Sequence, residues 1–304
     1  MRAIGNEVPP TSTPMRFSYA EALCDPTHYL PLARAVEDAG WDTFIVPDSI
    51  CYPEVSDSKY PYTPDGNREF LEDKPFIEPF VLMSAMAAVT TKLRFTTFVI
   101  KLPIRIPVLI AKQAASLAVM SQNRFVFGVG TSPWPEDFIV TGSDWKTRGA
   151  RLNEMIDIIR GLTAGGYFEY HGKNYDIPSI KICPTPTEPI KILIGGHAEP
   201  ALKRAARNDG WMHAGGDQTK LEEYIARLHE LRREYGREHL PFEIHAISFD
   251  GFTVDGVKKL ADFGVTDVIV GFRNVYDRDT QPLPKKIEAL RMFADHVIAK
   301  CEGV

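Results

Sequence analysis

The sequence lacks the features that mark several large classes of protein. Its 304 residues carry a net charge of −5 and contain no long apolar run, so we expect neither nucleic-acid binding nor a membrane span. The four cysteines stand far apart, without a C-x-x-C spacing, which is typical of free thiols in a reducing compartment. These absences predict a globular, cytoplasmic protein.

Common catalytic signatures are also missing. The chain has no H-E-x-x-H, no G-x-S-x-G, no Walker loop and no G-x-G-x-x-G. His213 and His245 fall in two successive β-type runs, where they could converge, but no close cluster of His and Cys accompanies them. We therefore predict no metal site and keep a metal-dependent barrel hydrolase only as an alternative.

The chain starts with MRAIGNEVPPTSTP, which has three prolines and no apolar core. This composition predicts a disordered tail over residues 1–14 rather than a secretion signal. Residues 15–304 are then expected to form a single domain, because short β-type runs alternate with longer amphipathic runs throughout them.

Eight β-type runs occur, and several lack the polar alternation of a half-exposed strand. They are residues 16–20, 43–47, 93–100, 124–130, 191–196, 210–215, 242–249 and 267–272. The helix candidates between them are 27–39, 78–90, 108–121, 149–163, 200–207, 217–235, 254–263 and 284–300. Eight strands that are each followed by a helix predict an α/β protein with a (β/α)8 TIM barrel and insertions, with a doubly wound sheet as the alternative.

Three connections are longer than a barrel needs. Residues 48–77, 131–148 and 273–283 all follow predicted strands, so they belong to the carboxyl-terminal face, where barrel enzymes hold their substrates. Residues 165–190 instead lie between a helix and a strand and contain YFEYHGKNYDI. This segment predicts a hairpin that turns near 171–174 and lies apart from the site.

Glycines follow two of the predicted strands. Gly195 and Gly196 stand between an apolar run and a helix that begins near residue 199, and Gly130 is followed by Thr131 and Ser132. Glycine allows positive φ and close approach to a ligand, and a helix amino terminus attracts anions. Each pair taken alone is equally consistent with a tight turn, but together they favour a phosphorylated cofactor.

Longer segments resemble the luciferase-like monooxygenase superfamily, and more closely its coenzyme F420-dependent (deazaflavin) oxidoreductase branch. The resemblance extends from Arg16 to the carboxyl terminus. The matching segments are specific to the superfamily, but they distinguish members that use FMN from members that use the deazaflavin much less well. The segments that carry it are LARAVEDAGWDTFIVPDSI, YPYTPDG, TTKLRFTTFVIKLPIRIPVLIAKQAASLAVMSQNRFVFGVGTSPWPEDF, RGARLNEMIDIIRGL, IKILIGGHAEPALKRAARNDGW and GVTDVIVGF.

The resemblance implies a TIM barrel, often dimeric, with the cofactor ring over the end of the third strand. There it implies a non-proline cis peptide around Thr97, Phe98 and Val99, which bends the ring. The same resemblance places ring or ribityl contacts on Gly130, Thr131 and Ser132, and phosphate contacts on Gly195, Gly196, His197 and Ala198.

The chain departs from the family where acid–base chemistry is expected. Ser49 stands where many relatives carry a histidine, Pro133 where some carry a glutamate, and Phe98 where a glycine is usual. Serine cannot shuttle protons near neutral pH as histidine does. Another residue, or water, would then supply the proton, unless the protein binds cofactor with little turnover. The candidate catalytic residues are Ser49, Asp48 and Glu136, with Tyr60 and Tyr62 as further proton donors.

The expected function is hydride transfer between F420 and an organic small-molecule substrate by a homodimer. The first alternative is an FMN-dependent monooxygenase served by a separate reductase. A metal-dependent hydrolase and a cofactor-binding protein without turnover are alternatives of other classes.

Overall fold

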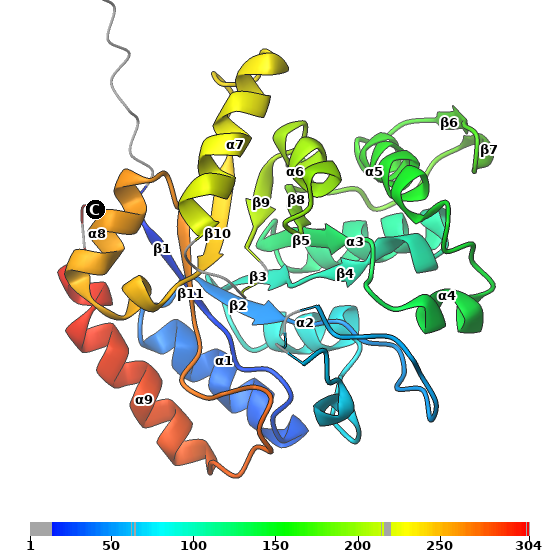
Figure 1. Cartoon of the computed structure of the whole chain (residues 1–304). Coiled ribbons are helices and arrows are strands. Elements are labelled where there is room, and N and C mark those ends of the chain that lie inside the picture. The colour runs from blue at the N-terminus through cyan, green and yellow to red at the C-terminus, as the bar shows by residue number, and fades with distance from the viewer. Residues whose placement is uncertain are drawn as a thin grey trace, which may run out of the picture.

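A closed barrel of parallel strands, surrounded by helices, forms the body of the protein (Figure 1). The computed structural model describes residues 14–61, 63, 65–213, 215, 220–301 and 303. Apart from Pro14, the predicted tail lies outside the described residues, and so does Tyr62.

The barrel closes because β1 pairs with both β2 and β11, and β3 pairs with β5. Its strands are β1 (Arg16–Tyr19), β2 (Thr43–Val46), β3 (Arg94–Thr97), β5 (Phe125–Gly130), β8 (Ile192–Gly195), β9 (Gly210–Met212), β10 (Glu243–Ile247) and β11 (Asp267–Val270). Every pairing among them is parallel, and the short β4 (Ile100–Lys101) continues β3 along β5. The predicted TIM barrel is confirmed, and the doubly wound sheet is wrong.

The helices lie outside the barrel, and proline stands in the first turn of several of them, where its missing N–H costs nothing. They are α1 (Tyr29–Asp38), α2 (Pro79–Ala87), α3 (Pro107–Met120), α4 (Pro135–Thr141), α5 (Arg148–Thr163), α6 (Glu199–Ala206), α7 (Leu221–Glu234), α8 (Val254–Asp262) and α9 (Leu283–His296). No helix of the described residues is long and apolar enough to cross a membrane.

One sequence expectation changes in detail, and another is confirmed. Helix α4 lies inside the long loop 131–148, although Pro135 followed by Glu136 and Asp137 is a recognisable helix start. The expected hairpin is present as the antiparallel strands β6 (Phe168–His171) and β7 (Asp176–Ile180). It lies beside α5, at the edge of the molecule (Figure 1).

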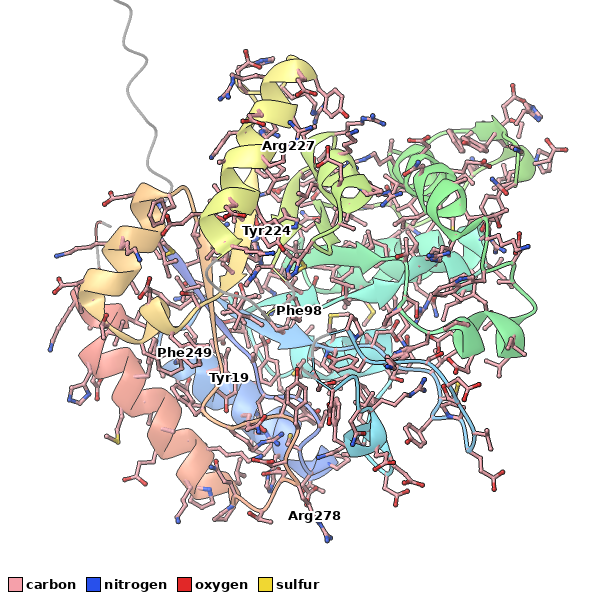
Figure 2. The ribbon with its side chains drawn as sticks, viewed as in Figure 1. Tyr19, Phe98, Tyr224, Arg227, Phe249 and Arg278 are labelled. Carbon is pink, nitrogen blue, oxygen red and sulfur yellow. The ribbon has the colours of Figure 1, made fainter. Side chains whose placement is uncertain are left out.

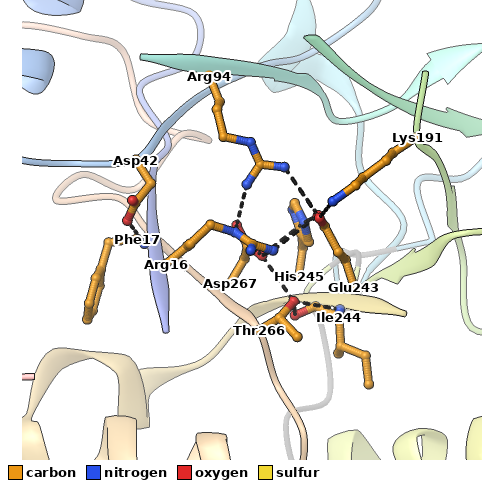
Figure 3. A network of polar contacts seen from close by, with 10 residues as sticks. All are labelled: Arg16, Phe17, Asp42, Arg94, Lys191, Glu243, Ile244, His245, Thr266 and Asp267. Carbon is orange, nitrogen blue, oxygen red and sulfur yellow. Dashed lines mark hydrogen bonds and ion pairs between the residues drawn. The ribbon is translucent and has the colours of Figure 1, made fainter. Parts of the chain in front are cut away.

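A group of charged side chains fills the amino-terminal end of the barrel (Figure 3). We name it the basal ion cluster: Arg16, Arg94, Lys191, Glu243, His245 and Asp267. Arg16 Nη2 lies 2.5 Å from Asp267 Oδ2 and 3.2 Å from Glu243 Oε2. Glu243, His245 and Asp267 have the spacing of metal ligands, but three cations already face their carboxylates. We therefore assign the cluster to closing the barrel.

Candidate functional site

The opposite end of the barrel carries the predicted cis peptide. The bond between Phe98 and Val99 is cis, at the position that the resemblance implied. Both side chains are half-buried and pack against Val126, Leu193 and Met212, in a small apolar group separate from the main core. Figure 2 shows Phe98 in the middle of the barrel.

Glycines surround Val99 and explain its fit. A Cβ on Gly130 would lie 2.8 Å from Val99 Cγ2, and a Cβ on Gly195 would lie 2.8 Å from Val99 Cγ1. A Cβ on Gly128 would lie only 1.9 Å from the carbonyl oxygen of Thr97. These glycines are therefore required by the protein's own packing at the end of β3, whatever else they contact.

The turn between β8 and α6 has the features of an anion site. Gly196 has φ +117°, which favours glycine. Helix α6 starts after Ala198, which has no side-chain cap. Pro200 has no N–H, and the Ala201 N–H donates to the Ala198 carbonyl oxygen, so the Glu199 N–H is the first-turn donor that is available to a ligand. Glu199 in the first turn is paired with Arg227 Nη2 at 2.8 Å, which offsets its negative charge.

A stack of aromatic rings lines the same turn. His197 stacks between His213 and Tyr224, with centroid distances of 4.8 Å to each. His213 is fully buried, its Nδ1 lies 3.1 Å from the Ile247 carbonyl oxygen, and its Nε2 has no hydrogen-bond partner among the described residues. Burial lowers the pKa of His213 to about 4. The Ile247 carbonyl oxygen can only accept, so Nδ1 carries the proton of the neutral imidazole and Nε2 is an acceptor. The uncapped helix start therefore fits the phosphate of a cofactor, whereas Nε2 fits a hydroxyl donor.

Asp48 follows β2 and is held on both carboxylate oxygens. Oδ1 pairs with Arg105 Nη2 at 2.8 Å, and Oδ2 accepts a hydrogen bond from the Lys101 backbone N–H at 2.9 Å. The side chain is buried. This arrangement joins the end of β2 to the end of β4, so it favours a positioning role for Asp48.

The loop after β5 is held in a similar way. Ser132 has φ +70°, donates a hydrogen bond to Asp137 Oδ2 at 2.7 Å and accepts one from the Trp134 N–H at 3.0 Å. Lys101 Nζ lies 2.8 Å from the same Asp137 oxygen. The Ser132 hydroxyl therefore shapes the loop, while Thr131 beside it is half-buried. Thr97 likewise donates to the Gly128 carbonyl at 2.7 Å.

Glu136 is the acidic candidate on α4. Its carboxylate accepts hydrogen bonds from Ser56 and Ser58 and lies 3.4 Å from Arg68 Nη1. Burial by itself raises the pKa of Glu136, but these hydrogen bonds and the Arg68 charge outweigh burial, so the pKa lies below its ordinary value. Glu136 is thus an anion at neutral pH and a poor proton donor.

Ser49 lies on the wall of a cavity of about 190 Å³, which Tyr52, Arg68, Phe76 and Trp134 also line. The sequence analysis named neither Arg68 nor this cavity, although both involve the long loop after β2. Tyr60, the other proton-donor candidate that the structure describes, stacks on Trp134 with centroids 5.6 Å apart.

A second group with the spacing of metal ligands comprises Cys24, His28 and Asp279. Asp279 Oδ2 lies 2.5 Å from Lys286 Nζ, so this carboxylate already has a cationic partner. Burial raises the pKa of Cys24 to about 12, which keeps it a thiol rather than a metal-binding thiolate. The absence of a metal site stays a prediction.

Comparisons with known proteins agree with the fold. An uncharacterised protein of Mycobacterium tuberculosis is 63% identical over 288 residues, covering 94% of this chain and 100% of the relative. An F420-dependent glucose-6-phosphate dehydrogenase of Nakamurella multipartita is 29% identical over 225 residues, covering 69% of this chain and 59% of the relative. The crystal structure of a monooxygenase from Streptomyces bottropensis superposes with a TM-score of 0.73 at 16% identity, covering 94% and 99% of the two chains.

The family model described as luciferase-like monooxygenase matches residues 8–249. The match covers most of the barrel, including the cis peptide after β3 and the turn between β8 and α6. The chain therefore belongs to the luciferase-like monooxygenase family.

Proposed function

We propose that the protein is an oxidoreductase that transfers a hydride between coenzyme F420 and an organic small-molecule substrate. The observation that carries the proposal is the barrel mouth itself, where the Phe98–Val99 peptide lies between glycine-bearing strand ends. The F420-dependent dehydrogenase among the relatives supports the choice of cofactor. When bound, the deazaflavin supplies the hydride chemistry, and the protein binds and orients the reactants.

The chain's own groups divide into two sets. The Gly196 turn and the start of α6 would hold the phosphate, because they offer backbone N–H groups. Phe98 and Val99 would support the ring, with Thr131 beside it. The ion pairs of Asp48 with Arg105 and of Asp137 with Lys101 would keep the strand ends in place.

Ser49 is the catalytic candidate that reaches the cavity. Among the described residues its hydroxyl makes one long contact, 3.4 Å to the Cys51 carbonyl oxygen, and it can exchange this contact for a substrate oxygen. A hydroxyl binds and orients such a group, and the proton itself would then come from water.

The second candidate is an FMN-dependent monooxygenase served by a separate reductase, because the family model carries the monooxygenase description. The test is a titration of the purified protein with each cofactor, followed by the quenching of cofactor fluorescence. Binding of F420 alone is the expected result. Binding of FMN alone would support the monooxygenase. Binding of neither cofactor would contradict both candidate functions.

We also propose a homodimer. Val81 on α2, Leu109 on α3 and Ile139 on α4 are apolar yet largely exposed, and α2 contacts α3. Exposed apolar side chains on neighbouring helices are typical of subunit interfaces. Sedimentation equilibrium measures the mass, and a monomer at micromolar concentration would contradict the proposal.

A further inference from the structure

The cavity beside the barrel mouth has an apolar wall and a cationic end. Ser49 and Ile50, which follow β2, form its inner side, and Tyr52, Phe76 and Trp134 supply aromatic surface. Its volume of about 190 Å³ suits a fragment the size of one substituted ring. A cavity that begins where a barrel strand ends is in the place expected for a substrate.

Arg68 is the cationic end, and it is held rigidly. The residue is only 8% exposed, and its Cζ lies 4.0 Å from the ring centre of Trp134 and 5.5 Å from that of Tyr52. Nη1 donates to Ser56 Oγ at 2.9 Å and lies 3.4 Å from Glu136 Oε2. Stacking on one side and hydrogen bonds at one nitrogen fix the plane of the guanidinium.

The other edge of this guanidinium is unused. Nε is buried without a hydrogen-bond partner, and Nη2 makes no hydrogen bond to any described residue. The Nε and Nη2 hydrogens form the fork that matches the two oxygens of a carboxylate. A buried donor left unpaired costs about 1–3 kcal/mol, so a ligand that pairs with it gains what the protein alone leaves unsatisfied.

The charge of the cavity wall agrees with an anionic ligand. Arg68 and Lys74 line the cavity, against a single lining anion, Asp73. Lys74 Nζ donates to the Asp277 carbonyl at 2.7 Å, which accounts for one of its three N–H groups. The Glu136 carboxylate lies behind Arg68 and is occupied by the hydroxyls of Ser56 and Ser58.

We propose that this cavity binds the carboxylate of a small aromatic or α,β-unsaturated acid. The two carboxylate oxygens would lie on Nη2 and Nε of Arg68 after a small shift of the side chain that opens the buried Nε to the cavity, and the planar part would lie against Tyr52 and Phe76. That the acid is the substrate rests on the proposed oxidoreductase function, whereas its binding does not. The pairing selects an acid over its ester or amide, since a neutral group gains much less from the guanidinium.

The test is calorimetric titration of the cofactor-free protein with trans-cinnamate and with trans-cinnamamide, its neutral analogue. We expect cinnamate to bind about tenfold or more tightly than the amide. This comparison uses the unaltered chain, so it does not depend on whether a variant folds. Equal affinity, or no measurable binding of cinnamate, would overturn the proposal.

Variants locate the binding. Arg68→Gln should weaken cinnamate binding about tenfold or more, and Arg68→Lys should give an intermediate loss because the charge remains without the fork. Arg291→Gln is the matched control, because Arg291 is exposed on α9 and does not line the cavity. Unchanged binding by Arg68→Gln, or an equal loss in the control, would contradict the assignment.

The cofactor titration is read separately. Cinnamate binding through Arg68 without F420 or FMN binding would refute the proposed function and keep the acid site. Cofactor binding without cinnamate binding would refute the acid site and keep the proposed function.

Discussion

Val99 lies between Gly130 and Gly195, and each glycine lacks the one carbon atom that would collide with it. The two hypothetical Cβ atoms would approach the two methyl groups of Val99 to 2.8 Å. The glycine that ends β8 is thus linked to the cis peptide after β3, although the two lie almost a hundred residues apart in the sequence. This link connects the proposed phosphate turn to the proposed ring support.

Gly195→Ala should destabilise the protein by about 1–3 kcal/mol through overpacking against Val99. It should also weaken cofactor binding, because Val99 must move. Chemical denaturation and the cofactor titration measure the two effects. The added Val99→Ala change removes the collision, so the double variant should lose less stability than the sum of the single changes.

Gly149→Ala is the control for this pair. Gly149 lies in α5, and an added Cβ would meet its nearest neighbour at an ordinary 3.7 Å. Alanine there should leave stability unchanged or raise it slightly, by up to about 1 kcal/mol. If both alanine variants behave alike, Val99 does not require Gly195.

His213 should make stability depend on pH. Its folded-state pKa of about 4 lies below the ordinary 6.5, so between these values the unfolded chain binds more protons. The free energy of unfolding therefore falls as the pH is lowered through this window, by about 2 kcal/mol from this residue between pH 7 and pH 5.

His213→Gln isolates that contribution. On going from pH 7 to pH 5 the variant should lose about 2 kcal/mol less than the unaltered chain in urea denaturation. Parallel losses in the two proteins would show that the imidazole is not buried in its neutral form.

Glu243→Gln should weaken the basal ion cluster. Arg16, Arg94 and Lys191 all face this carboxylate. Removing its charge leaves Asp267 as the anion that faces both arginines and takes away the carboxylate partner of Lys191. We expect a loss of about 3 kcal/mol at pH 7, measured by denaturation. Glu288→Gln, at an exposed position of α9, should have no effect.

The same residue predicts acid sensitivity. Burial by itself raises the pKa of Glu243, but the hydrogen bond with His245 and the charges of Arg94 and Arg16 lower it overall. A carboxyl group with a lowered folded-state pKa stabilises above its unfolded pKa, and that stabilisation is lost as the pH falls below about 4. The gap between the unaltered chain and Glu243→Gln should therefore narrow between pH 5 and pH 3.

Ser49→His tests the departure from the family. A histidine at the cavity wall should change the turnover rate or the cofactor affinity and add a pH dependence near neutrality. Ser49→Ala should leave stability unchanged, because the hydroxyl makes a single long contact within the part of the chain that the structure describes. If rate, affinity and pH profile are all unaltered in Ser49→His, Ser49 is not part of the site.

The alternation of apolar runs and amphipathic segments was sufficient to predict the barrel, its eight strands and the hairpin between α5 and β8. These elements follow from local burial patterns and from the rule that parallel strands need crossover helices. Helix α4 was not predicted, because a helix of seven residues carries little periodic signal. Its first residues, Pro-Glu-Asp, are nevertheless typical of a helix start. The family resemblance added the position of the cis peptide.

The tertiary structure decided what individual side chains are free to do. Asp48 and Glu136 read in the sequence as available acids, yet each is held by an arginine and by hydrogen bonds from distant segments. The sequence predicted that Gly195 contacts a phosphate, whereas the structure shows that a side chain at this position would collide with Val99. In the sequence, Arg68 is one of several cations in a long loop. The structure shows that its guanidinium stacks on Trp134 and that its buried Nε has no hydrogen-bond partner among the described residues. Such partners come from other strand ends, so no local pattern in the sequence can reveal them.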